Sequence, residues 1–253
     1  MSGELGTVVW VFRRELGARF DSMSALTVTI VFALVAHGLY FFLGHPVGDL
    51  QLPSLWAGRV ASLQVVFAWL PLLFVGLIPA LTMGAWAEER ASGTEELLFT
   101  WPVSGRASVL GKFLAVWFFL GLVLTVAILP LAIMVSSLGN LDWGTVFGGL
   151  LGAFLLAGAC IAISLFLSSL FSEQLSAFLS SALLLGLLWS AGLLVHVMPP
   201  GLADAVFYTS PYAHFFDSAA RGVFDLRDLI YHTSLMVLGL WCNTLVVEGR
   251  RWA

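Results

Sequence analysis

The chain has 253 residues, of which 60% are hydrophobic and only 10% are charged, and its mean hydropathy is +0.98. A soluble domain carries about a quarter charged residues, so this composition excludes an ordinary soluble protein. The net charge of −4, with no basic run longer than two residues, gives no sign of nucleic-acid binding.

The first 24 residues form no continuous apolar core of the kind that a secretory signal has. Their apolar residues recur mostly at three- and four-residue steps, while charged residues occupy the rest of the helical wheel. This pattern predicts an amphipathic helix on the membrane surface, and the alternative is a frayed polar leader. The apolar stripe consists of Leu5, Val8, Val9, Phe12, Leu16, Phe20 and Met23.

Six long apolar runs follow, and they predict an all-α integral membrane protein with six transmembrane helices in one domain, 1–253. A helix needs roughly 20 apolar residues to cross the bilayer, and a charge at its centre costs about 2.5–3.5 kcal/mol. None of the six runs contains Asp, Glu, Lys or Arg, whereas a soluble bundle would show charged outer faces. The predicted spans are 25–44, 63–87, 113–138, 145–171, 175–198 and 229–247.

The segment between spans 2 and 3, residues 88–112, is the most highly charged in the chain. Ser92 with Glu95 fits a capping box, with Thr94 as a competing N-cap, and Pro102 ends this short helix. Ser104 then caps a helix that continues into span 3. We therefore expect a helix–turn–helix elbow, and the alternative is a solvated loop. The elbow's apolar residues are Leu97, Leu98, Phe99 and Trp101.

The stretch GRASVLGK within this segment resembles a phosphate-binding loop only superficially. Such a loop has four residues between its glycines, then Lys and Ser or Thr, and follows a strand. Here five residues separate Gly105 from Gly111, and Phe113 follows Lys112. We expect the chain to bind no nucleotide, cofactor or metal itself.

Two later segments carry patterns with open interpretations. A row of small residues lies at the start of span 4 and consists of Gly144, Gly148 and Gly152. This row serves either packing within the chain or contact with another subunit. Residues 199–228 form the largest segment on the other side of the membrane, with either a re-entrant helical cap or a simple surface helix. Asp225 or Asp228 is expected to cap span 6.

The distribution of basic residues predicts the orientation of the chain in the membrane. Six spans place both termini on one side, and eight Lys and Arg residues lie on that side against three on the other. The positive-inside rule therefore predicts that both termini and residues 88–112 are cytoplasmic. The eight are Arg13, Arg14, Arg19, Arg90, Arg106, Lys112, Arg250 and Arg251, and the three are Arg59, Arg221 and Arg227.

The stretch LIPALTMGAWAEERASGTEELLFTWPVSGRASVLGKFLA resembles the signature of ABC-2 type permeases, specifically the gliding-motility-associated branch. In that pattern an Ala-Glu-Glu-Arg element and Gly-Thr-x-Glu-Leu-Leu precede a Pro-Val-Ser turn and a Leu-Gly-Lys-Phe entry to span 3. The later stretch SPYAHFFDSAARGVFDLRDLIYHTSL and the closing EGRRWA resemble further motifs of the same branch.

The resemblance implies that the elbow is the coupling helix, which binds a separate ATPase subunit. It implies a permease that is not itself an enzyme, with ATP-Mg held in two partner ATPase subunits and a second permease copy or sister permease completing the path in the cell inner membrane. The implied contact residues are Glu88, Glu89, Arg90, Gly93, Thr94, Glu95, Glu96, Leu97, Leu98 and Phe99.

Other classes of membrane protein fit less well. An ion-coupled transporter usually carries charged residues within its spans, and these spans have none. A membrane enzyme needs a convergent polar site, which the sequence lacks. A subunit that relays force to an outer-side partner, without moving substrate itself, stays open as the alternative function.

Overall fold

The computed structural model describes residues 2–44, 52–58, 60–94, 104–194, 198–218, 222 and 225–251. Among these residues, six helical segments are long and apolar enough to cross a membrane, which confirms the predicted all-α class. The long helices are α2 (Met23–Phe42), α4 (Gln64–Thr82), α7 (Gly105–Leu138), α8 (Trp143–Leu170), α9 (Gln174–Leu194) and α12 (Leu226–Arg251). The other helices are α1 (Ser2–Asp21), α3 (Leu55–Gly58), α5 (Gly84–Ala91), α10 (Pro200–Thr209) and α11 (Pro211–Asp217).

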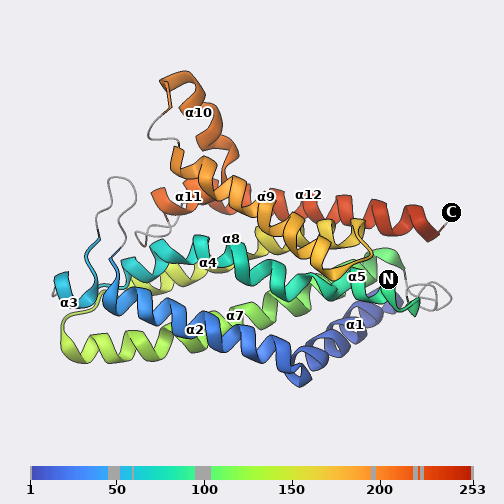
Figure 1. Cartoon of the computed structure of the whole chain (residues 1–253), viewed down its shortest axis with the longest axis horizontal. Helices are drawn as coiled ribbons and strands as arrows, with labels where there is room; N and C mark the ends of the chain where they lie inside the picture. The colour runs from blue at the N-terminus through green and yellow to red at the C-terminus, as the bar shows by residue number, and fades with distance from the viewer. Residues whose placement is uncertain are drawn as a thin grey trace.

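The helices run roughly side by side, and the two chain ends lie at the same end of the bundle (Figure 1). The short helix α5 lies at that end too, while α3 lies at the opposite end. The two chain ends and α5 therefore share one side, as the even number of spans predicts.

The second predicted span is divided in the structure. Helix α4 ends at Thr82 and α5 begins at Gly84, on either side of Met83. Ser168 of α8 holds this break, because its hydroxyl donates to the Met83 carbonyl at 2.9 Å and accepts from the Trp86 amide at 3.3 Å. Because Met83 keeps right-handed helical dihedrals, α4 and α5 are two parts of one membrane-crossing segment, Gln64–Ala91, with a local interruption of the helix at Met83.

Helix α7 begins at Gly105 and continues through the third predicted span, as the sequence predicted for a helix that starts after Ser104. The Ser104 hydroxyl accepts a hydrogen bond from the Ala107 amide at 3.2 Å, which confirms the predicted cap. At α12, the Asp225 carboxylate accepts from the Arg227 amide at 3.0 Å, so Asp225 rather than Asp228 is the cap.

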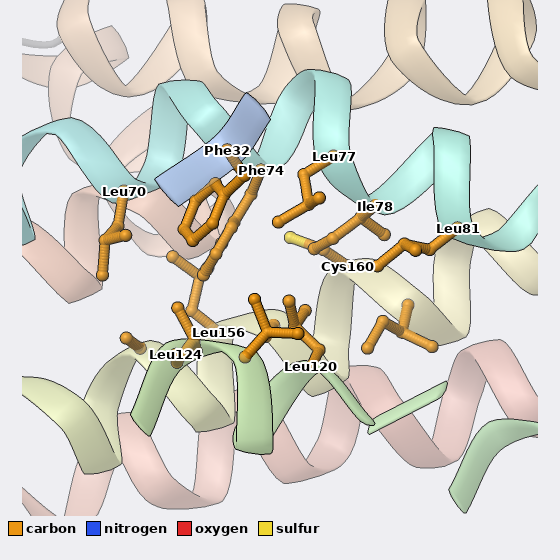
Figure 2. Close-up of a cluster of buried hydrophobic side chains, with 14 of the residues drawn as sticks. Phe32, Leu70, Phe74, Leu77, Ile78, Leu81, Leu120, Leu124, Leu156 and Cys160 are labelled. Carbon is orange, nitrogen blue, oxygen red and sulfur yellow. The ribbon is translucent and has the colours of Figure 1, made fainter. Parts of the chain in front are cut away.

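The core lies around α4 and α8, which are the most enclosed of the spans. Figure 2 shows aliphatic and aromatic side chains from α4 meeting Leu120 and Leu124 of α7 and Leu156 and Cys160 of α8. Phe32 of α2 closes one side of this cluster. Helices α2 and α9 are much less enclosed, as expected of helices on the outside of the bundle.

Small residues bring helices close to α8 on two faces. A Cβ at Gly149 would lie 2.5 Å from the Phe67 ring, and a Cβ at Gly239 of α12 would lie 3.0 Å from Ala162. These glycines permit tight approach of α4 and α12 to α8, and such packing is the main source of cohesion between helices in lipid.

The described residues of the segment 199–228 include the two helices α10 and α11. Helix α11 packs into the bundle with Tyr212 and Phe215 fully buried, while α10 projects away from the bundle (Figure 1). His214 and Asp228 link α11 to α12 through a 2.9 Å contact between Nδ1 and Oδ1. This arrangement favours a packed helical cap over a simple surface helix.

Candidate functional site

The candidate site is the base of the bundle, where α5 leads towards α7. Of the predicted contact residues, Glu88, Glu89 and Arg90 lie on α5, and Gly93 and Thr94 follow it. Glu88, Gly93 and Thr94 are exposed, whereas Glu89 and Arg90 are partly buried. The remaining predicted contacts, Glu95, Glu96, Leu97, Leu98 and Phe99, lie outside the described residues.

The Ser92 hydroxyl binds the end of α5, because it donates to the Glu88 and Glu89 carbonyls at 2.8 and 3.3 Å. Glu95, the other member of the predicted capping box, lies outside the described residues, so the capping box stays a prediction. Gly93 has φ +71°, a left-handed conformation that commonly terminates helices and that glycine adopts without a Cβ clash. The motif therefore contains a helix stop, and the next helical residue, Thr94, follows it directly.

Lys112 is the central residue of the base. Its side chain is 3% exposed, and its ammonium group donates to Glu89 Oε1 at 2.7 Å, to Glu15 Oε1 at 3.3 Å and to the Ala85 carbonyl at 2.8 Å. It also lies 4.8 Å from the centre of the Trp86 ring. All three ammonium hydrogens thus have acceptors, which joins α7, α5 and α1 at one point.

Arg90 binds the end of α8. Its Nη1 and Nη2 atoms donate to the carbonyls of Phe171 and Ser169, at 2.9 and 2.6 Å. These carbonyls belong to the end of α8, where backbone acceptors have no partner within the helix and carry partial negative charge. A planar guanidinium can bind two such oxygens at once, which a lysine cannot do in the same geometry.

Arg19 binds a third helix end in the same way. Its Nη1 donates to the Leu81 carbonyl, at 2.6 Å, near the end of α4. Burial lowers the pKa of the Arg19 guanidinium below its ordinary value, and the Glu15 carboxylate opposes this shift. The basic residues counted for membrane orientation thus also satisfy carbonyl groups at the base of the bundle.

Gly111, in the GRASVLGK stretch, lies where α1 and α7 are in contact. A Cβ there would lie 2.6 Å from Cβ and Cγ1 of Val11, so α1 and α7 touch at this point. Val11 is buried, although it was not in the predicted apolar stripe, and the predicted stripe residues Leu5 and Met23 are exposed. Gly111 therefore permits close helix packing, and Lys112 belongs to an ion cluster. These roles differ from those of the Gly and Lys residues in a phosphate-binding loop.

A polar cleft of about 440 Å³ lies between α1, the start of α2, the end of α4 and α5. Its charged lining residues are three cations and three acids, so the cleft has no net charge when all are ionised. These residues are Arg14, Arg19, Lys112, Glu15, Glu88 and Glu89. Within the described part of the chain, no cluster of His, Cys, Asp and Glu side chains suits a metal ion.

The small-residue row on α8 has mixed environments. Gly144 is exposed and Gly152 is buried, while a Cβ added at Gly148 would lie only 2.8 Å from the Gly222 carbonyl oxygen. Gly148 therefore serves packing within the chain. Contact of this row with another subunit stays a prediction.

Sequence reasoning missed Glu15 and Arg14 as members of the site. Arg14 Nη2 lies 3.5 Å from Glu89 Oε1, which places a second α1 residue in the Lys112 cluster. The position of Glu15 on the helical wheel was the available signal. It lies next to Leu16 and close to Phe12, so it is a charged residue on the otherwise apolar side of an amphipathic helix.

Comparison with known proteins now adds to this geometry. Residues 58–246 match the family model described as ABC-2 family transporter protein. The chain is also 31% identical over 176 residues to the probable ABC transporter permease protein NosY of Pseudomonas aeruginosa, an alignment that covers 67% of this chain and 62% of that relative. Since the family model spans most of the chain and the six helical spans agree with it, this protein belongs to the ABC-2 family of transporter proteins.

Proposed function

We propose that this chain is the permease subunit of an ABC exporter, which couples ATP hydrolysis by separate ATPase subunits to transport across the inner membrane. Family membership supports the permease role. The observation that carries the coupling role is the base of the bundle, where Glu89, Arg90 and Lys112 fasten the helix before the α5–α7 connection to its neighbours.

The side of the membrane follows from the charges. Both chain ends and α5 lie at one end of the bundle (Figure 1), and the side that they share carries eight of the eleven basic residues. We infer that this end faces the cytoplasm, where ATP and an ATPase subunit are available.

The assembly that we propose contains two permease chains and two ATPase subunits, since six spans are half of a translocation path. The second permease is another copy or a sister chain. Assignment to the gliding-motility-associated branch is a further proposal, and it rests on the sequence motifs of residues 77–115 and 210–235 and on the closing EGRRWA. Nothing among the described residues favours the alternative of a subunit that relays force to an outer-side partner.

The test is co-purification of the cognate ATPase subunit with the permease, followed by the ATPase rate of the complex. The Glu95→Lys/Glu96→Lys double variant reverses two charges in the proposed contact and leaves the spans unchanged. We expect loss of the ATPase subunit at equal permease levels in the membrane. Asp204→Lys, on exposed α10 in the outer segment, is the control and is expected to retain it.

Two results would count against the proposal. Failure of the wild-type permease to retain its ATPase subunit contradicts the coupling role as a whole. Normal assembly and normal ATPase rates in the double variant show that these two glutamates make no important contact, and the contact site must then be sought elsewhere.

A further inference from the structure

Helix α5 has an unusual mechanical position. It is only eight residues long, it is separated from α4 by the break at Met83, and it ends at Gly93 in a left-handed conformation. Met83 keeps right-handed helical dihedrals, φ −53° and ψ −41°, so α5 continues α4 along the backbone. The backbone therefore carries movement of the α5–α7 connection into α5 and α7, and the side-chain contacts of α5 carry it to α1 and α8.

Those contacts run in two directions. Glu89 binds Lys112, whose other acidic partner is Glu15 of α1, and Arg90 binds the two carbonyls at the end of α8. Successive residues of a helix point about 100° apart, since 3.6 residues complete a turn. The consecutive residues Glu89 and Arg90 are thus fastened to different neighbours of α5.

We propose that Lys112 and Arg90 are positioning residues that lock α5 to α1 and to α8, so that force applied to the α5–α7 connection reaches both helices together. This inference rests on the proposed function, because it takes an ATPase subunit as the source of the force. It adds the route of transmission and the two side chains that form it.

The neighbours of α5 are suited to carry the movement further. Helix α1 is packed against α7 through the close approach at Gly111, and α8 is packed against α12 through the close approach at Gly239. Ser168 adds a second tie between α8 and the start of α5. Movement of α5 is therefore delivered to α7 on one side and to α12 on the other.

Burial makes the Lys112 tie strong. Its side chain is 3% exposed, and Glu15 and Glu89 are each 14% exposed, so water screens these charges only weakly. The pair formed by Arg106 and Glu248 joins α7 to α12 at the same end of the bundle, but Arg106 is 74% exposed and its Nε lies 3.4 Å from Glu248. Exposed pairs of this kind contribute little, so Arg106→Gln is the matched control.

The first experiment measures distances in the purified chain, without an ATPase. Spin labels at Gly17 on α1 and Ala91 on α5, both exposed, report on the Lys112 tie, and labels at Ala91 and Leu170 report on the Arg90 tie. The background has Cys160 and Cys242 replaced by alanine.

We expect narrow distance distributions in the unmodified background and in Arg106→Gln. Lys112→Met is expected to broaden the Gly17–Ala91 distribution, and Arg90→Gln is expected to broaden the Ala91–Leu170 distribution. If both variants keep distributions as narrow as the control, the locking of α5 is refuted.

The second experiment measures coupling in the complex with the cognate ATPase subunit. Lys112→Met and Arg90→Gln are expected to retain the subunit but to lose its permease-dependent stimulation by about 2- to 30-fold, the range found for mutations that modulate coupling between two sites. Arg90→Lys keeps the charge without the two-oxygen geometry, so it should restore stimulation only in part. A purely structural role would reduce assembly and stimulation together.

The outcomes separate the two proposals. Wild-type chain that retains no ATPase contradicts the proposed function, while the distance measurement still decides whether Lys112 and Arg90 lock α5. Normal stimulation in both variants overturns the transmission route. Where Lys112→Met does not accumulate in the membrane, Glu89→Gln/Lys112→Met replaces it, because this variant removes the charge on both partners of the closest pair and keeps Glu15 as the acidic neighbour of the buried Arg19.

Discussion

Replacement of Gly111 by alanine is expected to loosen α1 from α7. The added Cβ would lie 2.6 Å from two carbon atoms of Val11 and 3.2 Å from the Phe12 amide nitrogen. Carbon atoms do not approach to 2.6 Å without movement of one partner, and Val11 is branched and buried. Helix α1 must therefore shift away from α7.

Comparison with Gly17→Ala gives the expected change in the free energy of unfolding. Overpacking costs about 1–3 kcal/mol, whereas a helical glycine replaced by alanine gains about 1 kcal/mol of helix propensity. Gly17→Ala on α1 has the same propensity gain with no atom within 4 Å of the new Cβ. The gain cancels in the comparison, so the unfolding free energies of the two variants should differ by about 1–3 kcal/mol.

Labelling of a native cysteine can measure this difference in stability. Cys160 is fully buried, so a thiol-reactive dye labels it only when the bundle opens, and Cys242→Ser removes the partly exposed thiol. In this background the labelling temperature of Gly111→Ala should fall below that of Gly17→Ala, by about 2–4 °C for each kcal/mol in a chain of this size. Equal or higher stability of Gly111→Ala would refute the tight packing of α1 on α7.

Three further predictions follow from the same base. Ser168→Ala should lower the unfolding free energy by about 1–3 kcal/mol, measured in the same dye assay, because it leaves two buried backbone groups at the α4–α5 break without their partner. The purified chain should show no saturable ATP binding by calorimetry, since Lys112 is enclosed in an ion cluster; tight binding would contradict this. Cysteines introduced at the exposed positions Ser92 and Asp204 should react with an impermeant reagent from opposite sides of the membrane, and reaction of both from outside intact cells would contradict the orientation.

The spans and several helix ends could be predicted because their signals are local. An uncharged apolar run of about 20 residues has few alternatives to a membrane helix. The N-cap at Ser104 was likewise predicted from the residue type and its position next to a helical segment, and a cap involves only residues three or four positions away.

The Ser92–Gly93 step shows where a local signal is ambiguous. Ser followed three residues later by Glu is compatible with a helix start, and Gly is compatible with a helix stop. The two interpretations place Ser92 on opposite sides of a boundary, and the choice depends on whether the preceding helix continues to Ala91. It does, because α5 is held in place by α8 and Lys112.

The sequence by itself determined the class of the protein, its number of spans and the position of its charged base, because hydrophobicity and charge act at each residue independently of distant partners. The tertiary structure alone decided what the base contains. Lys112 and Glu15 are 97 positions apart, and Arg90 and Phe171 are 81 apart. Such pairs exist only after helices pack, and packing in lipid depends on close approach at positions such as Gly111, which a pattern of polar and apolar residues does not encode.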